Sequence, residues 1–126
     1  MSNPFGYSDA IWQRFNDTPA AGALVADQGE GRLCVARVRS KAADLELMLS
    51  LRSVDGRIVD ARFLALGCPT TIAVGQWLCE TLPGLGCEEA RALRAPQLIA
   101  ALEIADNRLH CALLGEDAVA AALKEV

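Results

Sequence analysis

Apolar and polar residues alternate most strictly in the middle of the chain, where every second position is a leucine. The alternating residues are Leu45, Leu47, Leu49 and Leu51. A period of two places their side chains on one face of an extended chain, so a half-buried strand is predicted here. Val54-Asp55-Gly56-Arg57 follows as a turn signal, and the run from Ile58 to Leu66 is predicted to return as the second arm of a hairpin.

The N-terminal third contains one more strand and one helix by the same reasoning. A strand is predicted from Arg32 onward, with Arg37 and Arg39 facing solvent. Tyr7 to Phe15 has apolar residues at helical spacing, with Ser8 available as an N-cap. The stretch 16–31 between them is rich in Pro, Gly, Asp and Ala and is expected to be a mobile connection.

After Gly67 the pattern becomes helical. Pro69 suits the first position of a helix, where its missing N–H costs nothing, and Pro83-Gly84 ends that helix. The predicted helices are Cys68–Thr81, Glu88–Leu93, Ala95–Leu102 and a last one capped by Asn107 and running through Glu125. The fold class is therefore α+β, with a small three-stranded antiparallel sheet packed against a cluster of helices, in a single domain spanning 1–126.

Charge and hydropathy exclude several classes of function. The formal net charge is −4, and the basic residues are scattered rather than gathered in the stripe that a nucleic-acid binder needs. The apolar runs are too short to cross a bilayer, and the first residues have neither a basic nor an apolar leader region. We therefore expect a cytoplasmic protein with no nucleic-acid or membrane partner.

Two of the five cysteines stand at predicted helix starts. Cys68 precedes Pro69, and Cys111 follows His110, the only histidine, at the start of the last helix. The helix dipole and the unpaired N–H groups there favour a thiolate, which zinc, iron and persulfide chemistry all require. The alternative is that both are small apolar residues of the core, as is expected of Cys34, Cys79 and Cys87.

The order of these features resembles the NifU/IscU-type iron–sulfur cluster assembly scaffolds. Asp60–Cys68 is similar to their strand-to-helix segment, and Leu109–Ala118 is similar to their His-Cys helix. The run from His110 to Ala118 is the most specific part. Tyr7-Ser8 resembles the N-terminal segment more weakly, and the resemblance covers the chain from Tyr7 onward.

The resemblance implies a non-enzymatic scaffold that holds a labile [2Fe–2S] cluster or zinc. It also implies sulfur delivery as persulfide from a cysteine desulfurase, onto Cys111 or Cys68, and apo iron–sulfur proteins as recipients. Ala42-Ala43-Asp44 stands where the family has a Cys-Gly-Asp turn, so the first cluster cysteine is missing. Asp44, Cys68, His110 and Cys111 remain as the candidate ligands.

A second departure precedes the last helix. Family members served by a dedicated Hsp70 chaperone carry a Leu-Pro-Pro-Val-Lys segment there, whereas this chain has Ile104-Ala105-Asp106-Asn107-Arg108. Cluster release through that chaperone is therefore not expected.

Two alternatives to the scaffold hypothesis remain open. The chain is either a scaffold or a degenerate paralogue that keeps the fold and a partner surface without building clusters. A nucleophilic Cys111 with His110 as base is the enzyme-class alternative, although neighbours on a helix point about 100° apart.

Overall fold

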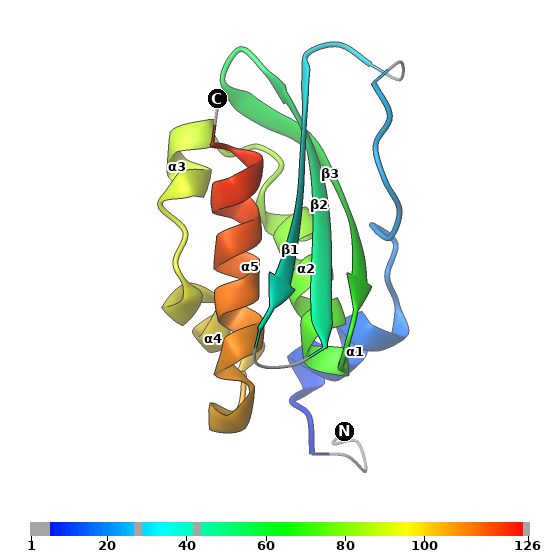
Figure 1. Cartoon of the computed structure of the whole chain (residues 1–126), viewed down its shortest axis with the longest axis vertical. Coiled ribbons are helices and arrows are strands. Elements are labelled where there is room, and N and C mark those ends of the chain that lie inside the picture. Colours follow the sequence, from blue (N-terminus) through cyan, green and yellow to red (C-terminus); the bar gives the residue numbers. More distant parts are fainter. Residues whose placement is uncertain (1–5, 27–28, 42–43, 125–126) are drawn as a thin grey trace.

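The alternating leucines form the centre of a three-stranded antiparallel sheet with strand order β1-β2-β3. The computed structural model describes residues 6–26, 29–41 and 44–124. Its strands are β1 (Arg32–Ser40), β2 (Leu45–Val54) and β3 (Arg57–Leu66). The four leucines of β2 are buried on one face, as predicted from their period of two. Figure 1 shows the sheet with its helices.

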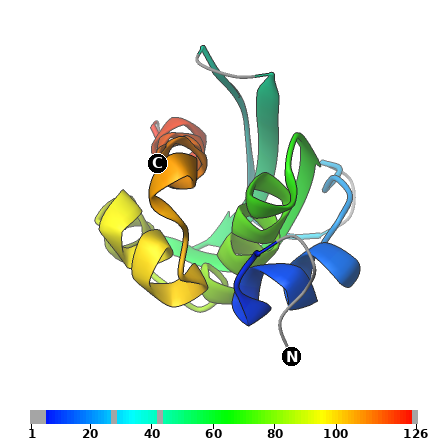
Figure 2. The same cartoon turned by 90° about the horizontal axis from the view of Figure 1, so that it is seen from below.

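Helices cover the leucine face of this sheet (Figures 1 and 2). The helices are α1 (Asp9–Asn16), α2 (Pro69–Thr81), α3 (Cys87–Arg91), α4 (Ala95–Leu102), the 3-10 turn η1 (Asp106–Arg108) and α5 (Leu109–Ala122). α2 packs against β3, whereas α5 packs against β1 and β2. α1 lies on α2 and α4 lies on α5, so the predicted α+β architecture is confirmed.

Two glycines let the helices approach their neighbours closely. A Cβ on Gly75 of α2 would overlap the ring of Phe63 in β3. A Cβ on Gly115 of α5 would overlap Val74 of α2 and Leu98 of α4. Glycine at these two positions therefore sets how closely α2 lies to the sheet and α5 lies to α2.

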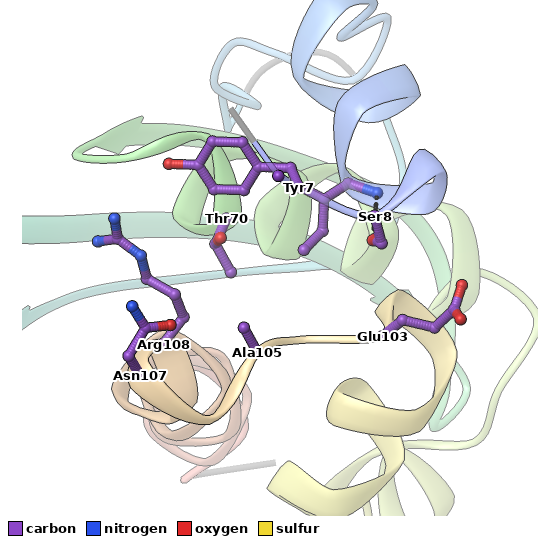
Figure 3. Close-up of a pocket in the computed structure, with 9 residues that line it drawn as sticks. Tyr7, Ser8, Thr70, Glu103, Ala105, Asn107 and Arg108 are labelled. Atoms are coloured by element: carbon purple, nitrogen blue, oxygen red, sulfur yellow. Dashed lines mark hydrogen bonds between the residues drawn. The ribbon is translucent and has the colours of Figure 1, made fainter. Parts of the chain in front are cut away.

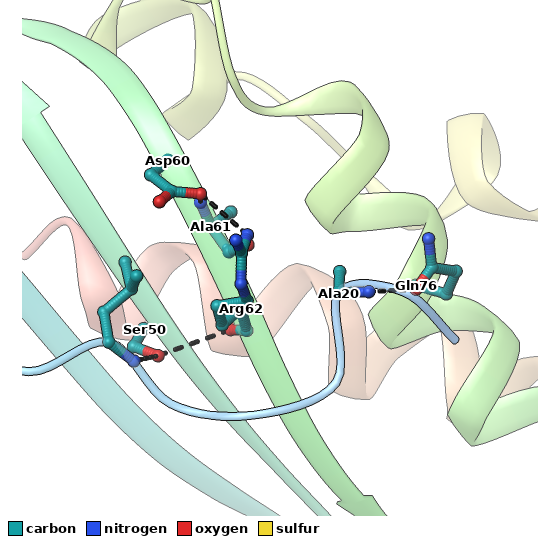
Figure 4. A network of polar contacts seen from close by, with 7 residues as sticks. Ala20, Ser50, Asp60, Ala61, Arg62 and Gln76 are labelled. Atoms are coloured by element: carbon teal, nitrogen blue, oxygen red, sulfur yellow. Dashed lines mark hydrogen bonds and ion pairs between the residues drawn. The ribbon is translucent and has the colours of Figure 1, made fainter.

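The segment before β1 is bound to the sheet over its described part, which corrects the expectation of a mobile connection. The backbone N–H of Gly22 donates to the carbonyl of Phe63, and the N–H of Phe63 donates to the carbonyl of Ala20. The Ala20 N–H donates to the Gln76 side chain of α2 (Figure 4). These bonds close part of the free edge of β3, whose N–H and C=O groups would otherwise be unpaired.

The same segment covers part of the outer face of the sheet. Leu24 N–H donates to the Ser50 hydroxyl, and Arg52 donates to the carbonyl oxygens of Val25 and Gly29. Ser50 and Arg52 are consequently buried although they point away from the helices. Beside them, Arg62 pairs with Asp60 at 2.7 Å (Figure 4).

Helix starts agree with prediction except at the last helix. Ser8 accepts from the Ile11 N–H as the N-cap of α1, and its own hydroxyl donates to the Leu102 carbonyl. Asn107 does not cap α5, because it lies inside η1 and Arg108 takes the cap position without a side-chain bond. No helix among the described residues is long and apolar enough to span a bilayer.

Candidate functional site

The turn between β3 and α2 places Cys68 at the start of a helix. Gly67 has φ +144°, and a Cβ there would overlap the side chain of Leu45, so the turn requires glycine. Cys68 follows as the N-cap residue of α2, with Pro69 at the first helical position, as predicted. Its side chain is half-buried at the helix N-terminus, where N–H groups have no partner within the helix.

The second cysteine, Cys111, is positioned by the 3-10 turn η1 and the start of α5. α5 begins at Leu109 directly after η1, and Cys111 is its third residue, in the first turn as predicted. Cys111 is fully buried, with none of its surface exposed. It therefore enters the interior between α5 and α2, which contact one another.

The fold brings the two sulfur atoms together although the residues are 43 positions apart. The Sγ atoms of Cys68 and Cys111 lie 3.7 Å from one another. Thr71 completes the cluster, because its hydroxyl donates to the Cys111 Sγ at 3.4 Å and lies 3.6 Å from the Cys68 Sγ. The result is a compact group of two sulfurs and one hydroxyl at the start of α2.

The environment of the pair favours a thiolate at Cys68 and a protonated thiol at Cys111. The Cys111 thiol donates to Cys68, and the N–H groups of Thr71 and Thr70 add to this, so the pKa of Cys68 is lowered to about 4 despite partial burial. The same contact, together with burial, raises the pKa of Cys111, with Arg108 acting in the opposite direction. We assign the negative charge to Cys68 because its sulfur is nearer to solvent and faces the helix N-terminus.

The other two expected ligands lie apart from this pair. Asp44 is exposed in the turn before β2, and His110 is half-buried as the second residue of α5. Among the residues that the structure describes, no three His, Cys, Asp or Glu side chains are grouped closely enough to hold a metal. Ala42 and Ala43, where the family pattern has Cys-Gly, lie outside the described residues.

Comparison with known proteins decides the family. The model of the NifU-like N-terminal domain matches residues 6–126. The chain belongs to this family. The iron–sulfur cluster assembly protein IscU of Plasmodium falciparum is 30% identical over 118 residues, covering 94% of this chain and 72% of that protein. The IscU scaffold of Haemophilus influenzae is 28% identical over 120 residues, covering 94% of each.

A solved structure supports the fold of this NifU-like domain. The N-terminal part of a NifU-like protein from Brucella abortus superposes with a TM-score of 0.76 at 20% identity, covering 93% of this chain and 91% of that one. At that level of identity the agreement concerns the fold. It confirms the arrangement of sheet and helices inferred from hydrophobic periodicity.

The remaining cysteines of the NifU-like domain are core residues, as expected. Cys34, Cys79 and Cys87 are all buried. Burial raises the pKa of Cys79 to about 12 and also raises the pKa of Cys34, so both stay protonated at neutral pH. Neither reactivity nor metal binding is favoured for such thiols.

Sequence reasoning missed the two threonines of the Cys68-Pro69-Thr70-Thr71 run. A residue three positions after an N-cap faces back toward the cap, and this spacing was the available signal for Thr71. Thr70 points elsewhere. Its hydroxyl is buried with no hydrogen-bond partner among the described residues.

A pocket lies next to Thr70, between the starts of α1 and α2 and the segment leading to α5 (Figure 3). Its volume is about 190 Å³. Tyr7, Ser8 and Arg108 also line it, so the Tyr-Ser pair of the N-terminal segment and the residue before α5 face the same pocket. The pocket is a separate feature from the cysteine pair, which does not line it.

Proposed function

We propose that this chain is an iron–sulfur cluster assembly scaffold-like protein that accepts sulfur from a cysteine desulfurase and holds a labile [2Fe–2S] cluster or zinc. The observation that carries the proposal is the approach of Cys68 and Cys111 to 3.7 Å at two helix starts, in a chain of this family. Two adjacent sulfurs, one of them a thiolate, are what a soft metal or a transferred sulfur atom needs.

The proposed ligand set is Cys68, Cys111, Asp44 and His110. Two sulfurs, one carboxylate and one imidazole suit tetrahedral zinc, and mixed nitrogen and sulfur ligation also occurs in [2Fe–2S] centres. Only the sulfurs are already together, so Asp44 and His110 have to move toward the pair to complete the set. A site whose ligands have to move together favours a metal ion or cluster that is bound reversibly over a permanent cofactor.

The proposed partners follow from this role. The sulfur donor is a cysteine desulfurase, and the recipients are apo iron–sulfur proteins. The chain acts as one non-enzymatic unit in the cytoplasm. Release of the cluster does not depend on a dedicated Hsp70 chaperone, because the segment from Ile104 to Arg108 lacks the Leu-Pro-Pro-Val-Lys motif. Relatives named as iron–sulfur cluster assembly proteins, one of them as a scaffold, support the coarse role.

Anaerobic reconstitution tests the proposal. The purified chain is treated with iron and sulfide, or with zinc, then desalted and analysed for metal and acid-labile sulfide per chain. Wild type and Cys87→Ser, a matched change at a buried cysteine at the start of α3, are expected to retain cargo. Cys68→Ser and Cys111→Ser are expected to lose it. Absence of both cluster absorption and stoichiometric zinc from wild type would refute the proposal.

A second candidate function is favoured by one specific observation. Ala42 replaces the first expected cysteine, and no three potential ligands are grouped among the described residues. A degenerate paralogue would bind the desulfurase or a true scaffold as a regulatory module without assembling clusters. Desulfurase binding that persists in both Cys68→Ser and Cys111→Ser, in a wild type that retains no cargo, would favour this role. Loss of binding in both variants would count against it.

A further inference from the structure

The cysteine pair is unequal in a way that metal binding alone does not require. Cys68 is half-buried, whereas Cys111 is completely buried. The side chains that contact the Cys68 sulfur through polar atoms are those of Cys111 and Thr71, which are both buried. The accessible side of the Cys68 sulfur is therefore the side away from Cys111, and an incoming reagent meets Cys68 first.

We propose that Cys68 and Cys111 form a persulfide-resolving pair, in which Cys68 accepts a sulfur atom and Cys111 releases it as sulfide by forming a disulfide with Cys68. The inference rests on the proposed function in one respect, namely that the chain receives sulfur as persulfide. It deepens that function by assigning separate roles to the two cysteines and by giving the sulfur a route out of the site.

The first step transfers one sulfur atom. The Cys68 thiolate attacks the outer sulfur of a donor persulfide, a bond forms between Cys68 Sγ and that sulfur, and the donor leaves as a thiolate. The new outer sulfur has room only on the accessible side of Cys68, because Thr71 and Cys111 occupy the other side.

The second step reduces the transferred sulfur. Cys111 Sγ attacks Cys68 Sγ from the buried side, the disulfide forms, and the outer sulfur leaves toward solvent with the proton of the Cys111 thiol as hydrogen sulfide. The two cysteine sulfurs are oxidised and the outer sulfur is reduced, so the two electrons balance without another reagent. Attack and departure lie on opposite sides of Cys68, as displacement at sulfur requires.

The distances permit this reaction with a small movement. A disulfide has an S–S length of about 2.0 Å, so the two sulfurs have to close by about 1.7 Å from their present 3.7 Å. Cys68 is the N-cap residue and lies outside the regular helix, which lets its side chain turn toward Cys111. The Thr71 hydroxyl, donating to Cys111 Sγ at 3.4 Å, stabilises that sulfur as its proton leaves.

A dithiol protein or small dithiol then restores the pair. Its thiolate attacks the accessible sulfur of Cys68, and a second attack within the reductant completes the exchange, so the two electrons lost as sulfide are replaced. Two thiols suffice for this cycle. The absence of a cysteine at position 42 therefore does not impair it.

Glutathione persulfide is the probe that tests the pair. The reduced full-length chain is mixed with it anaerobically, free sulfide is measured over time, and the cysteines are mapped by mass spectrometry without reduction. Wild type is expected to release about one sulfide per chain and to gain a Cys68–Cys111 disulfide. In Cys111→Ser the persulfide on Cys68 is expected to persist at least about tenfold longer, because an adjacent thiol reacts at a very high effective concentration.

Two control variants separate the possible outcomes. Cys87→Ser should behave as wild type, and Cys68→Ser should acquire no persulfide at the buried Cys111. Equal persulfide lifetimes in wild type and Cys111→Ser, with no disulfide, would overturn the resolving role but leave sulfur acceptance intact. No persulfide on any variant would overturn sulfur acceptance itself, and the inference with it. If Cys111→Ser does not fold, Cys111→Ala and diamide oxidation of wild type provide the same comparison.

Discussion

Cys68 and Thr71 are three residues apart, and this short spacing organises the chemistry of the site. An N-cap side chain and the side chain three positions later lie over the same helix end, so the Thr71 hydroxyl reaches both sulfurs. The helix N–H groups and the Cys111 thiol then stabilise negative charge on Cys68. The start of α2 thus favours a thiolate at Cys68, and the Cys111 thiol of α5 stabilises the same negative charge.

The thiolate of Cys68 has a measurable pH signature. Since its pKa is lowered from 9.0 to about 4, alkylation of Cys68 by iodoacetamide should be level across neutral pH and fall to half near pH 4. Cys111→Ala removes the largest cause, so its midpoint should move up toward 9.0. Cys87→Ser should leave the profile unchanged, whereas a wild-type midpoint near the ordinary thiol value would contradict the assignment.

The lowered pKa of Cys68 also makes the free energy of unfolding depend on pH. Between about pH 4 and 9 the unfolded chain holds a proton on Cys68 that the folded chain does not. This group therefore makes the free energy of unfolding rise with pH in that window, and its contribution is lost as pH falls toward 4. The raised pKa of Cys111 acts in the opposite direction above pH 9.

Thr70 and Thr71 offer a matched pair of substitutions. Thr71→Val removes a hydroxyl that bonds Cys111, and it should lower the free energy of unfolding by about 1 kcal/mol. Thr70→Val removes a buried hydroxyl without a partner among the described residues, and it should raise that free energy by about 1 kcal/mol. Urea denaturation measures both, and equal losses in the two variants would contradict the hydrogen-bond assignment.

At the scale of elements, the site depends on how closely α5 approaches α2. Cys111 belongs to α5 and Cys68 precedes α2, so their separation follows the packing of these two helices. Gly115 lies on α5 one helical turn beyond Cys111 and allows that packing. The sheet contributes the other constraint, because Phe63 of β3 lies against Gly75 of α2.

Gly115→Ala tests this close approach. Alanine is favoured over glycine in a helix by about 1 kcal/mol, but here its Cβ would lie 2.6 Å from Val74 Cγ1 and 2.7 Å from Leu98 Cδ2. We expect a net loss of about 1–3 kcal/mol in the free energy of unfolding, measured in urea. Ala120→Gly, at an exposed position of α5, gives the propensity difference alone. A stabilised Gly115→Ala variant would show that the helices are not held this closely.

At the scale of the whole molecule, this chain keeps the fold of its family. The sheet and the order of the helices are those of the NifU-like fold. Position 42, where the family resemblance predicts the first cluster cysteine, is an alanine. Sulfur transfer needs two thiols and is compatible with this change, whereas stable metal binding benefits from a third.

Ala42→Cys restores the third thiol. We expect zinc affinity to rise at least about tenfold, equivalent to about 1.4 kcal/mol, because a neutral methyl group is replaced by a thiolate ligand. Competition with a chromophoric chelator measures the affinity, and Ala42→Ser is the control at the same position. Equal affinities in the two variants would mean that the turn before β2 does not contribute to the site.

The amino-acid sequence by itself determined the strands, most of the helices and the placement of two cysteines at helix starts. These features depend on local periodicity and on special residues such as Gly67 and Pro69, whose conformational limits act within a few positions. The predicted Asn107 cap was wrong because residues Asp106–Arg108 form a 3-10 turn, so that Arg108 and not Asn107 takes the cap position of α5.

Only the tertiary structure decided the distance between Cys68 and Cys111, the complete burial of Cys111 and the contact of the Thr71 hydroxyl with both sulfurs. It also decided that the segment before β1 lies along the sheet, since those hydrogen bonds join residues far apart in the chain. The physical reason is the same in both cases. Contacts across 43 positions depend on the packing of side chains from several elements, which no local pattern records.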